Sequence, residues 1–380
     1  MKRVNYISNL DLIQKTGGWS GVNVSLHGML SKRFELNSIG PINPGNDYPA
    51  KVISKLRRTS GFPGNFHYFS PSRLKKIASM VAERADAGAD CDFFHGSTPW
   101  ILFDSPRPYF AYVDTCFSTY VDVYHDRARF VQKDLKRIFE TESSWLSRAA
   151  GVFFGTQWAL EQTVNDYSLS GANLKVVGAA GSITVPESDR YREGINLLFI
   201  AFDFEKKGGR ICVDAFRKVK APFPDAQLTI VGGRPSPEIL ELPGVRYEGF
   251  LSKSVPSELN RLTELYATAF TLIHPTSSDI QPLVISEAGY FGCPSIAPAS
   301  FGIPELIDDG ITGFLMELPL NTDAFAQRIM QLATDNAMYR AMRKAVRANA
   351  LENQTWPAVG DRIAVEMERS SSDGSYDDIG

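Results

Sequence analysis

The sequence predicts an α/β protein built of two doubly wound domains that face each other across a central cleft. Apolar runs of strand length alternate with segments of helical periodicity along most of the chain, which is typical of parallel sheets covered by helices. At 380 residues the chain is long enough for two ordinary domains. A polar, proline-containing linker, VPESDRYREG at residues 185–194, separates the two halves.

Composition and charge exclude several classes of function. A net charge of −3 does not supply the basic surface that phosphates of nucleic acids require, so we expect no nucleic-acid partner. The chain has no run of about 18 apolar residues, and its start lacks the apolar core of a signal peptide. The four cysteines are far apart in apolar segments, which indicates buried, reduced thiols of a cytoplasmic protein: Cys91, Cys116, Cys212 and Cys293.

The first half is predicted to begin with a strand at residues 4–8, a polar loop at 9–21 and a helix at 22–30. The loop contains the sequence GGWSG, in which Gly17 and Gly18 allow a ligand to approach the backbone closely. A pair of glycines is equally typical of a plain turn between a strand and a helix, so the loop by itself does not identify a site.

Basic residues gather at two places in the same half, at 51–58 (KVISKLRR) and at 73–76 (RLKK). Such a face attracts an anionic membrane surface, each basic residue contributing roughly 1 kcal/mol. The alternative is an ordinary solvated helix face. We therefore predict a cytoplasmic protein, with peripheral contact at the inner face of the membrane through residues 51–58 as a second interpretation.

Two further strands of the first half end in polar side chains. The run CDFFHGSTPW at 91–100 contains His95 at the end of a buried strand, and the run YVDTCF contains Asp114 at the end of the following strand. A helix at 134–150, a strand and a helix at 151–169, and a last strand at 174–183 complete this half.

The second half opens with a strand at 195–202, the turn FDFEKKGG, and a helix that begins near Arg210. A buried strand at 226–233 ends in Gly-Gly, which lets the chain turn beside a ligand. A short strand, a loop and a helix follow at 245–262, and helical periodicity returns from about residue 324 to the end of the ordered chain.

The stretch at 274–315 contains the densest group of site signals. It is predicted as a strand running into His274, a polar turn, a helix opened by Pro282 and stopped at Gly292, and a second buried strand at 293–297. Proline suits the first helical position because its missing N–H would have no intrahelical partner there. Glycine is a natural left-handed residue after a helix.

Two carboxylates lie beside this helix start. Asp279 is at the mouth of the strand–helix–strand unit, and Glu287 follows inside the helix with seven residues between them. The first N–H groups of a helix, at the carboxyl ends of parallel strands, form an anion site. Carboxylates beside a phosphate are explained if the phosphate carries hydroxyl-rich groups, because carboxylates accept hydrogen bonds from sugar hydroxyls. The pattern therefore predicts a nucleotide-sugar ligand.

The stretch resembles the donor-binding signature of GT-B fold retaining glycosyltransferases of the family 4 type (glycosyl transferases group 1). Their usual pattern is Glu, seven residues, Glu. This chain has Asp279 at the first Glu, Pro282 where a Gly is usual, and FGIPE at 301–305 where a Gly-Gly segment is usual. The resemblance covers most of residues 190–355 and the first half in outline.

The resemblance implies a domain division. Residues 1–185 would form an acceptor-side Rossmann-like domain, and residues 190–354 would form the Rossmann-like domain that binds the donor. A final helix at about 355–370 would cross back to the first domain, and the low-complexity tail at 371–380 is expected to be disordered.

The resemblance also implies roles for individual residues of the second half. Lys207 would stabilise the diphosphate leaving group, Asp279 would hold the transferred sugar and Glu287 the ribose. Phe202 stands where the family has an arginine, whose charge Arg210, Arg234 or helix N–H groups would have to replace. The other implied donor contacts are Gly232, Phe250, Leu251, Pro282, Leu283 and Val284.

In the first half, the resemblance implies that Gly17 and Gly18 face the donor phosphates. Asp114 would line the reaction face, where the family usually has a histidine, and His95 is the other candidate for that position. No metal or other cofactor is expected, because no His/Asp cluster at metal-ligand spacing occurs.

The implied function is retaining transfer of a sugar from a nucleotide-diphosphate sugar to a hydroxyl acceptor. The acceptor would be a sugar, a lipid-linked oligosaccharide or a polymer, in polysaccharide or glycoconjugate synthesis. One alternative is another enzyme on the same fold, such as an epimerase or a phosphorylase. A second is a degenerate protein that binds a nucleotide or a partner without transfer. Phe202 and Asp279 support this alternative, because both depart from the family pattern.

Overall fold

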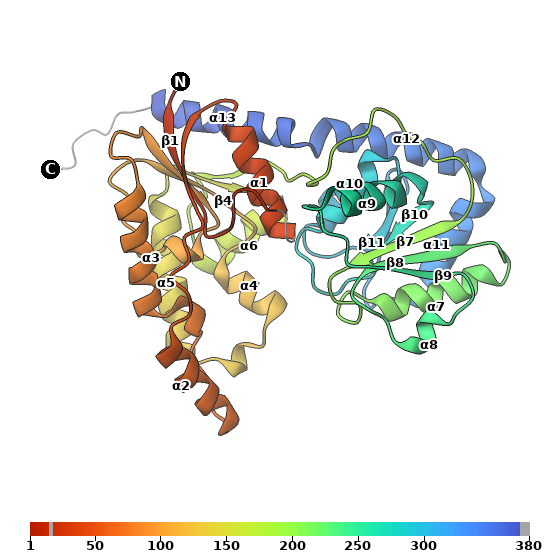
Figure 1. Cartoon of the computed structure of the whole chain (residues 1–380), viewed down its shortest axis with the longest axis horizontal. Coiled ribbons are helices and arrows are strands. Elements are labelled where there is room, and N and C mark those ends of the chain that lie inside the picture. The colour runs from red at the N-terminus through yellow and green to blue at the C-terminus, as the bar shows by residue number, and fades with distance from the viewer. Residues whose placement is uncertain (15–17, 373–380) are drawn as a thin grey trace. The chain divides into compact units, whose positions relative to one another are not determined.

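A computed structural model describes residues 1–14 and 18–372 of the chain (Figure 1). The described chain divides into two compact units. The first comprises Met1–Gln14, Asn23–Gly178 and residues 359–372, and the second comprises residues 18–22 and Ala179–Ala358. The predicted disordered tail lies outside the described residues from position 373 onward.

The first unit contains a six-stranded parallel sheet in the order β2-β1-β3-β4-β5-β6. The strands are β1 (Arg3–Ile7), β2 (Glu35–Ile39), β3 (Cys91–His95), β4 (Tyr109–Val113), β5 (Gly151–Phe154) and β6 (Leu174–Val176). Its helices are α1 (Gly18–Leu30, from Asn23 onward), α2 (Tyr48–Thr59), α3 (Pro71–Arg84), α4 (Phe117–Tyr124), α5 (Gln132–Arg148), α6 (Gln157–Tyr167) and α13 (Trp356–Ser372, from Val359 onward).

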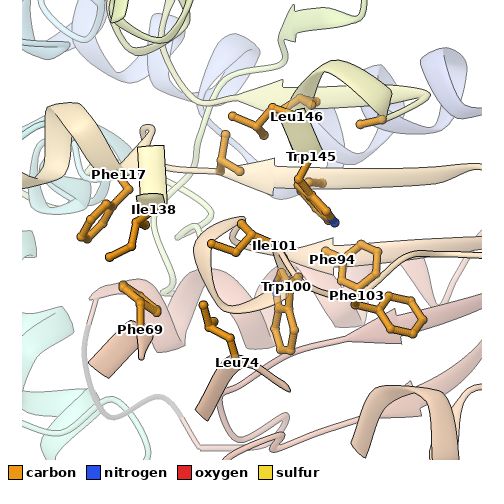
Figure 2. Packing of buried hydrophobic residues seen from close by; sticks show 14 of the residues in the cluster. Phe69, Leu74, Phe94, Trp100, Ile101, Phe103, Phe117, Ile138, Trp145 and Leu146 are labelled. Carbon is orange, nitrogen blue, oxygen red and sulfur yellow. The ribbon is translucent and has the colours of Figure 1, made fainter. Parts of the chain in front are cut away.

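Large aromatic side chains fill the first unit on both faces of its sheet. On one face Trp145 of α5 lies beside Phe94 of β3 (Figure 2). The ring centroid of Trp145 is 5.3 Å from that of Phe94 and 4.8 Å from that of Tyr109 of β4. On the other face Phe110 and Phe153 stack with their centroids 6.0 Å apart. Both faces of the strands are therefore buried, as expected for a parallel sheet covered by helices.

The second unit contains another six-stranded parallel sheet, in the order β12-β11-β10-β7-β8-β9. The strands are β7 (Asn196–Ala201), β8 (Gln227–Gly232), β9 (Val245–Gly249), β10 (Thr271–Ile273), β11 (Ser295–Pro298) and β12 (Gly313–Met316). The helices are α7 (Gly209–Lys220), α8 (Pro237–Leu240), α9 (Pro256–Thr268), α10 (Leu283–Tyr290), α11 (Thr322–Thr334) and α12 (Asn336–Asn353).

Alternate residues of β7 enter two separate hydrophobic cores, one on each face of this sheet. Leu197 and Phe199 pack in the core that α7 and α11 cover. Leu198 packs in the core that α9 and α10 cover, and Figure 1 shows these two helices together on one side of the strands. This arrangement confirms the predicted doubly wound α/β architecture of the second half.

The strand order reverses next to β7, and this reversal positions a site. From β7 the sheet continues through β8 and β9 on one side and through β10, β11 and β12 on the other. The chain that leaves β7 continues into α7 on one face of the sheet, and the chain that leaves β10 continues into α10 on the other face. Open α/β sheets bind ligands at the carboxyl ends of the strands where the strand order reverses in this way.

Several element boundaries differ from the sequence prediction for local reasons. Strand β6 ends at Val176, well before the predicted residue 183, and Gly178 follows with φ of 84°, which no strand residue adopts. Pro282 caps α10 with ψ of 106°, so it precedes the helix that it was predicted to begin. All four cysteines are buried and free, as predicted.

Candidate functional site

The turn between β7 and α7 is held tightly against the segment that follows β10. Gly208 adopts φ of +79°, and a methyl group there would lie 2.0 Å from the carbonyl oxygen of Pro275. Only glycine allows both this conformation and this approach. The sequence KKGG therefore brings the loop after β7 onto the loop after β10.

This packing places the side chain of Lys207 beside Asp279. The Lys207 ammonium donates to Asp279 Oδ2 at 2.9 Å and to the carbonyl oxygen of Ser278 at 2.6 Å. The two side chains are 22% and 21% exposed, so solvent and ligands can reach the pair. Two of the three residues of the second half that the sequence predicted to take part in the reaction, Lys207 and Asp279, are thus in direct contact at the strand-order reversal.

His274 is a third member of this group. It follows β10, is buried, and places its Nε2 atom 3.3 Å from Asp279 Oδ2. Burial by itself would raise the pKa of Asp279, but the hydrogen bond and charge of His274 and the charge of Lys207 outweigh it and lower that pKa. Asp279 is therefore an anion at neutral pH and can accept hydrogen bonds.

The sequence analysis did not name His274 as a site residue. The only available signal was its position at the end of a strand, directly before the polar turn.

The start of α10 supplies backbone donors close to this pair. Pro282 is the N-cap, and no side chain caps the helix. The N–H groups of Leu283 and Val284 belong to the first turn, whose N–H groups have no partner within an α-helix. Val284 is partly buried against a core cluster, so its contribution to a site would come from its backbone.

Glu287, near the middle of α10, lies in a different environment. Its side chain is 0% exposed, and the protein surrounds its carboxylate with donors. Oε1 accepts from the Lys253 ammonium, from the Ser182 N–H at 2.9 Å and from the Ser182 hydroxyl at 3.2 Å. Oε2 accepts from the Tyr266 hydroxyl at 2.9 Å.

The segment at 181–182 is fitted closely to α10. The Gly181 N–H donates to the Tyr290 hydroxyl at 2.8 Å, and a methyl group on Gly181 would lie 2.4 Å from Cγ of Glu287. Ser182, Lys253 and Tyr266 are therefore partners of Glu287 that sequence reasoning missed. They come from three separate segments, and no spacing in the sequence connects them.

Phe202, which stands where the resembled family has an arginine, is 84% exposed. Its ring meets that of Phe250 edge to face, with centroids 6.4 Å apart, and Phe250 is 53% exposed. Of the two cations considered as replacements, Arg210 pairs with Glu205 at 2.7 Å, and the Arg234 guanidinium lies 5.9 Å from the centre of the Tyr247 ring.

Two other predicted donor contacts have clear packing roles. Gly232 ends β8 with φ of +104°, and a methyl group there would lie 2.1 Å from the carbonyl oxygen of Ala201. Glycine is thus required by the close approach of β7 and β8. Leu251 packs against the core that α9 and α10 cover, so a donor contact at Leu251 would use its backbone. Contact of either residue with a donor stays a prediction.

The candidate residues of the first unit lie at the carboxyl ends of β3 and β4. His95 ends β3 and is fully buried, and loss of hydration lowers its pKa to about 3. Asp114 follows β4 directly. Burial and, to a smaller extent, the charge of Asp114 raise the pKa of Tyr120. Of the two glycines predicted to face the donor phosphates, Gly18 begins α1, belongs to the second unit and is exposed, whereas Gly17 lies outside the described residues.

Metal-ligand clusters and membrane-spanning helices are both absent from the residues that the structure describes. Within residues 1–14 and 18–372, no group of three His, Cys, Asp or Glu side chains is arranged to hold a metal ion. None of the helices described is both long and apolar enough to cross a membrane. The predicted independence of metal stays a prediction.

The sequence of the second unit matches a known family. Residues 194–335 match the family described as Glycosyl transferases group 1. The second unit is a glycosyl transferases group 1 domain. The Lys207–Asp279 pair, the start of α10 and Glu287 all lie within the matched residues, and the family predicted from the donor signature is confirmed.

Curated relatives are named glycosyltransferases. A GDP-mannose-dependent alpha-(1-6)-phosphatidylinositol monomannoside mannosyltransferase of Mycolicibacterium smegmatis is 30% identical over 168 residues, which are 42% of this chain and 44% of that protein. The sulfoquinovosyl transferase SQD2 of Arabidopsis thaliana is 28% identical over 347 residues, 85% of this chain and 64% of that protein. The chain spans about half the length of the curated relatives it matches.

Solved structures extend the likeness of fold to the whole chain. A sucrose-phosphate synthase from Thermosynechococcus elongatus superposes with a TM-score of 0.69 at 14% identity, covering 98% of this chain and 100% of that one. Anabaena Alr3699/HepE in complex with UDP gives a TM-score of 0.68 at 16% identity, covering 97% and 100%. These likenesses confirm the predicted GT-B fold class.

Proposed function

We propose that the protein is a retaining glycosyltransferase that moves a sugar from a nucleotide-diphosphate sugar to a hydroxyl acceptor. The observation that carries the proposal is the contact between Lys207 and Asp279, 2.9 Å apart at the strand-order reversal beside the start of α10. A cation, an anion and unpaired helix N–H groups at that point suit a diphosphate joined to a sugar.

The chemistry assigned to each group follows from its charge. As the glycosidic bond breaks, the leaving diphosphate gains negative charge, which Lys207 and the first N–H groups of α10 stabilise. Asp279 is an anion and accepts hydrogen bonds from hydroxyls of the transferred sugar. Glu287 is assigned to the ribose hydroxyls and Asp114 to the acceptor side of the reaction.

Release of nucleoside diphosphate tests the proposal. The purified protein is incubated with UDP-, GDP- and ADP-sugars in the presence of EDTA, with simple sugars and lipid-linked saccharides as acceptors. Acceptor-dependent release of one diphosphate is expected, with retention at the anomeric carbon of the product. Release that stops with EDTA would contradict metal-independent transfer, and release of a sugar phosphate would indicate a phosphorylase.

A binding protein without transfer is the second candidate function. Phe202 favours it, because an exposed aromatic ring stands where the family has a cation. Titration of the protein with the same nucleotides separates the two functions. Binding without release in the presence of every acceptor class would favour the binding protein.

We further propose that α2 contacts an anionic membrane surface. Tyr48, Val52 and Leu56 are spaced four residues apart on one face of this helix, and all are more than half exposed. Lys51 and Lys55 lie beside them and are also exposed. Exposed apolar residues next to basic ones are typical of helices that lie in a membrane interface.

The second basic segment, at 73–76, is only partly exposed: Lys75 and Lys76 are exposed, but its arginine is not. Arg73 is buried, and its guanidinium donates to the carbonyl oxygens of Gly45 and Tyr68. It supports the structure around α2 and does not present charge to a membrane, which corrects that part of the sequence interpretation.

Sedimentation with vesicles tests the membrane contact. Vesicles containing phosphatidylserine should bind the protein, and the double variant Lys51→Gln/Lys55→Gln should bind about 30-fold more weakly, since each cation contributes about 1 kcal/mol. The matched control Lys75→Gln/Lys76→Gln removes the same charge from α3 and should bind like the native protein. Equal losses in both variants would indicate attraction without a defined surface.

A further inference from the structure

The protein itself supplies donors to both oxygens of the Glu287 carboxylate. Lys253, the Ser182 N–H and the Ser182 hydroxyl donate to Oε1, and the Tyr266 hydroxyl donates to Oε2. A carboxylate oxygen offers about two lone-pair sites, so the sites of Oε1 are filled. A ribose hydroxyl can therefore bind Oε1 only when one of its three donors leaves.

The four donors differ in how easily they can move. The Ser182 N–H belongs to the backbone, fixed by the close fit of Gly181 to α10. Tyr266 is 0% exposed within the core beside α9. Lys253 lies in the loop between β9 and α9, its side chain is 19% exposed, and its ammonium is at the end of a flexible four-carbon stem. Lys253 is the donor that can leave.

A lysine that leaves Glu287 remains beside the nucleotide. The ribose is joined directly to the diphosphate, so an ammonium displaced by ribose hydroxyls is within a few bonds of phosphate oxygens. The diphosphate would gain from a further cation, because Phe202 carries no charge where the family has an arginine and Arg210 is paired with Glu205. A lysine ammonium and a phosphate form a strong, charge-assisted hydrogen bond.

We propose that Lys253 is an exchanging cation of the donor site. It neutralises Glu287 before the nucleotide binds, and it pairs with the diphosphate once the ribose hydroxyls have taken its place on Glu287. The inference rests on the proposed function, since it requires a nucleoside diphosphate at this site. It assigns to Lys253 a role in binding and positioning the donor.

The test compares the affinity for a nucleoside diphosphate with that for its nucleoside. The diphosphate among UDP, GDP and ADP that binds most tightly is chosen, and both dissociation constants are measured by competition against a fluorescent nucleotide. The dissociation constant of the nucleoside divided by that of the diphosphate gives a ratio that reports the contribution of the diphosphate alone. Lys253→Met should lower this ratio about tenfold, the loss of one charge-assisted hydrogen bond, while nucleoside binding stays equal or tightens. Lys253→Arg should preserve most of the ratio.

Lys253→Met leaves the buried Glu287 carboxylate without a counter-charge, and this variant could unfold. The comparison is therefore repeated in a neutral background, as Lys253→Met/Glu287→Gln against Glu287→Gln, where the same tenfold change is expected. Lys218→Met is the matched control, because it removes a surface charge from α7 of the same unit. Its ratio should equal that of the native protein.

The outcomes separate the inference from the proposed function. A lowered ratio in either background, with the control unchanged, supports the exchange. An unchanged ratio, with thermal stability lost in Lys253→Met, overturns it and leaves Lys253 as the structural partner of a buried carboxylate. If the native protein binds none of the three diphosphates, the proposed function fails, and the inference fails with it.

Discussion

Two carboxylates on either side of the start of α10 have nearly opposite surroundings. Asp279 precedes the helix, is 21% exposed, and pairs with a lysine and a histidine. Glu287, inside the helix, is 0% exposed and receives four hydrogen bonds. The sequence pattern treats them as equivalent ends of one motif, but the structure gives one of them access to solvent and makes the other part of the core.

The difference teaches that a motif residue can support the fold and the site at the same time. An exposed ion pair contributes little to stability, because water screens it and both side chains remain mobile. A buried ion pair is costly to break, because the group that stays buried has lost its partner. Substitutions at the two ends should therefore separate stability from activity.

The largest expected effect is on stability, from Glu287→Ala. This variant leaves the buried hydroxyls of Ser182 and Tyr266 without their acceptor and should lower the free energy of unfolding by about 3–5 kcal/mol. Urea denaturation measures the loss. Asp279→Ala, its counterpart at the partly exposed end, should cost less, about 1 kcal/mol. Similar losses in both variants would remove the distinction between the two ends.

The next effect is on catalysis, from Lys207→Ala. Removing the cation opposite the leaving diphosphate should lower kcat by about 10²–10³-fold, while the free energy of unfolding changes by less than about 1 kcal/mol. The neighbouring Lys206, 80% exposed and paired with Asp203, is the control, and Lys206→Ala should retain full activity. Equal activities of the two variants would exclude Lys207 from the reaction.

A smaller effect is expected from Tyr266→Phe, which removes one neutral donor from Glu287. A hydrogen bond to a charged acceptor contributes about 2 kcal/mol, so the free energy of unfolding should fall by about that amount. Tyr247→Phe is the control, since its hydroxyl donates to the neutral carbonyl of Gly232 at 2.9 Å and should cost about 1 kcal/mol. The reverse order would contradict the stronger hydrogen bond assigned to the Glu287 carboxylate.

The smallest effect concerns pH and Asp279. Its pKa is lowered in the folded protein, so the interaction stabilises the fold above the ordinary aspartate pKa and is lost as the pH falls below it. The stability difference between the native protein and Asp279→Asn should shrink as the pH falls below about 4. Denaturant midpoints across this range measure it, and a difference that grows in acid would contradict the lowered pKa.

The group around Asp279 could largely be predicted from the sequence. Lys207 and Asp279 each lie in the loop that follows a strand, and two strands that neighbour each other at a strand-order reversal bring such loops together. The glycines after Lys207 indicate that the backbone there packs closely against another segment. His274 was within reach of the same reasoning, because it also follows the carboxyl end of a strand.

The partners of Glu287 could not be predicted in this way. Ser182 comes from the segment before the second sheet, Lys253 from a loop and Tyr266 from α9, and their positions in the sequence have no common period. A buried charge collects donors from whatever segments the core brings near it. That set is known only once the sheets and helices have packed.

By itself the sequence determined the class of fold, the family of the second unit and the loops that bear its charges, because strand and helix periods and glycine positions are local properties. Only the tertiary structure decided which carboxylate is buried, that α2 exposes apolar residues beside its lysines, and that Arg73 is buried. Burial depends on which surfaces pack together, and that depends on the whole chain.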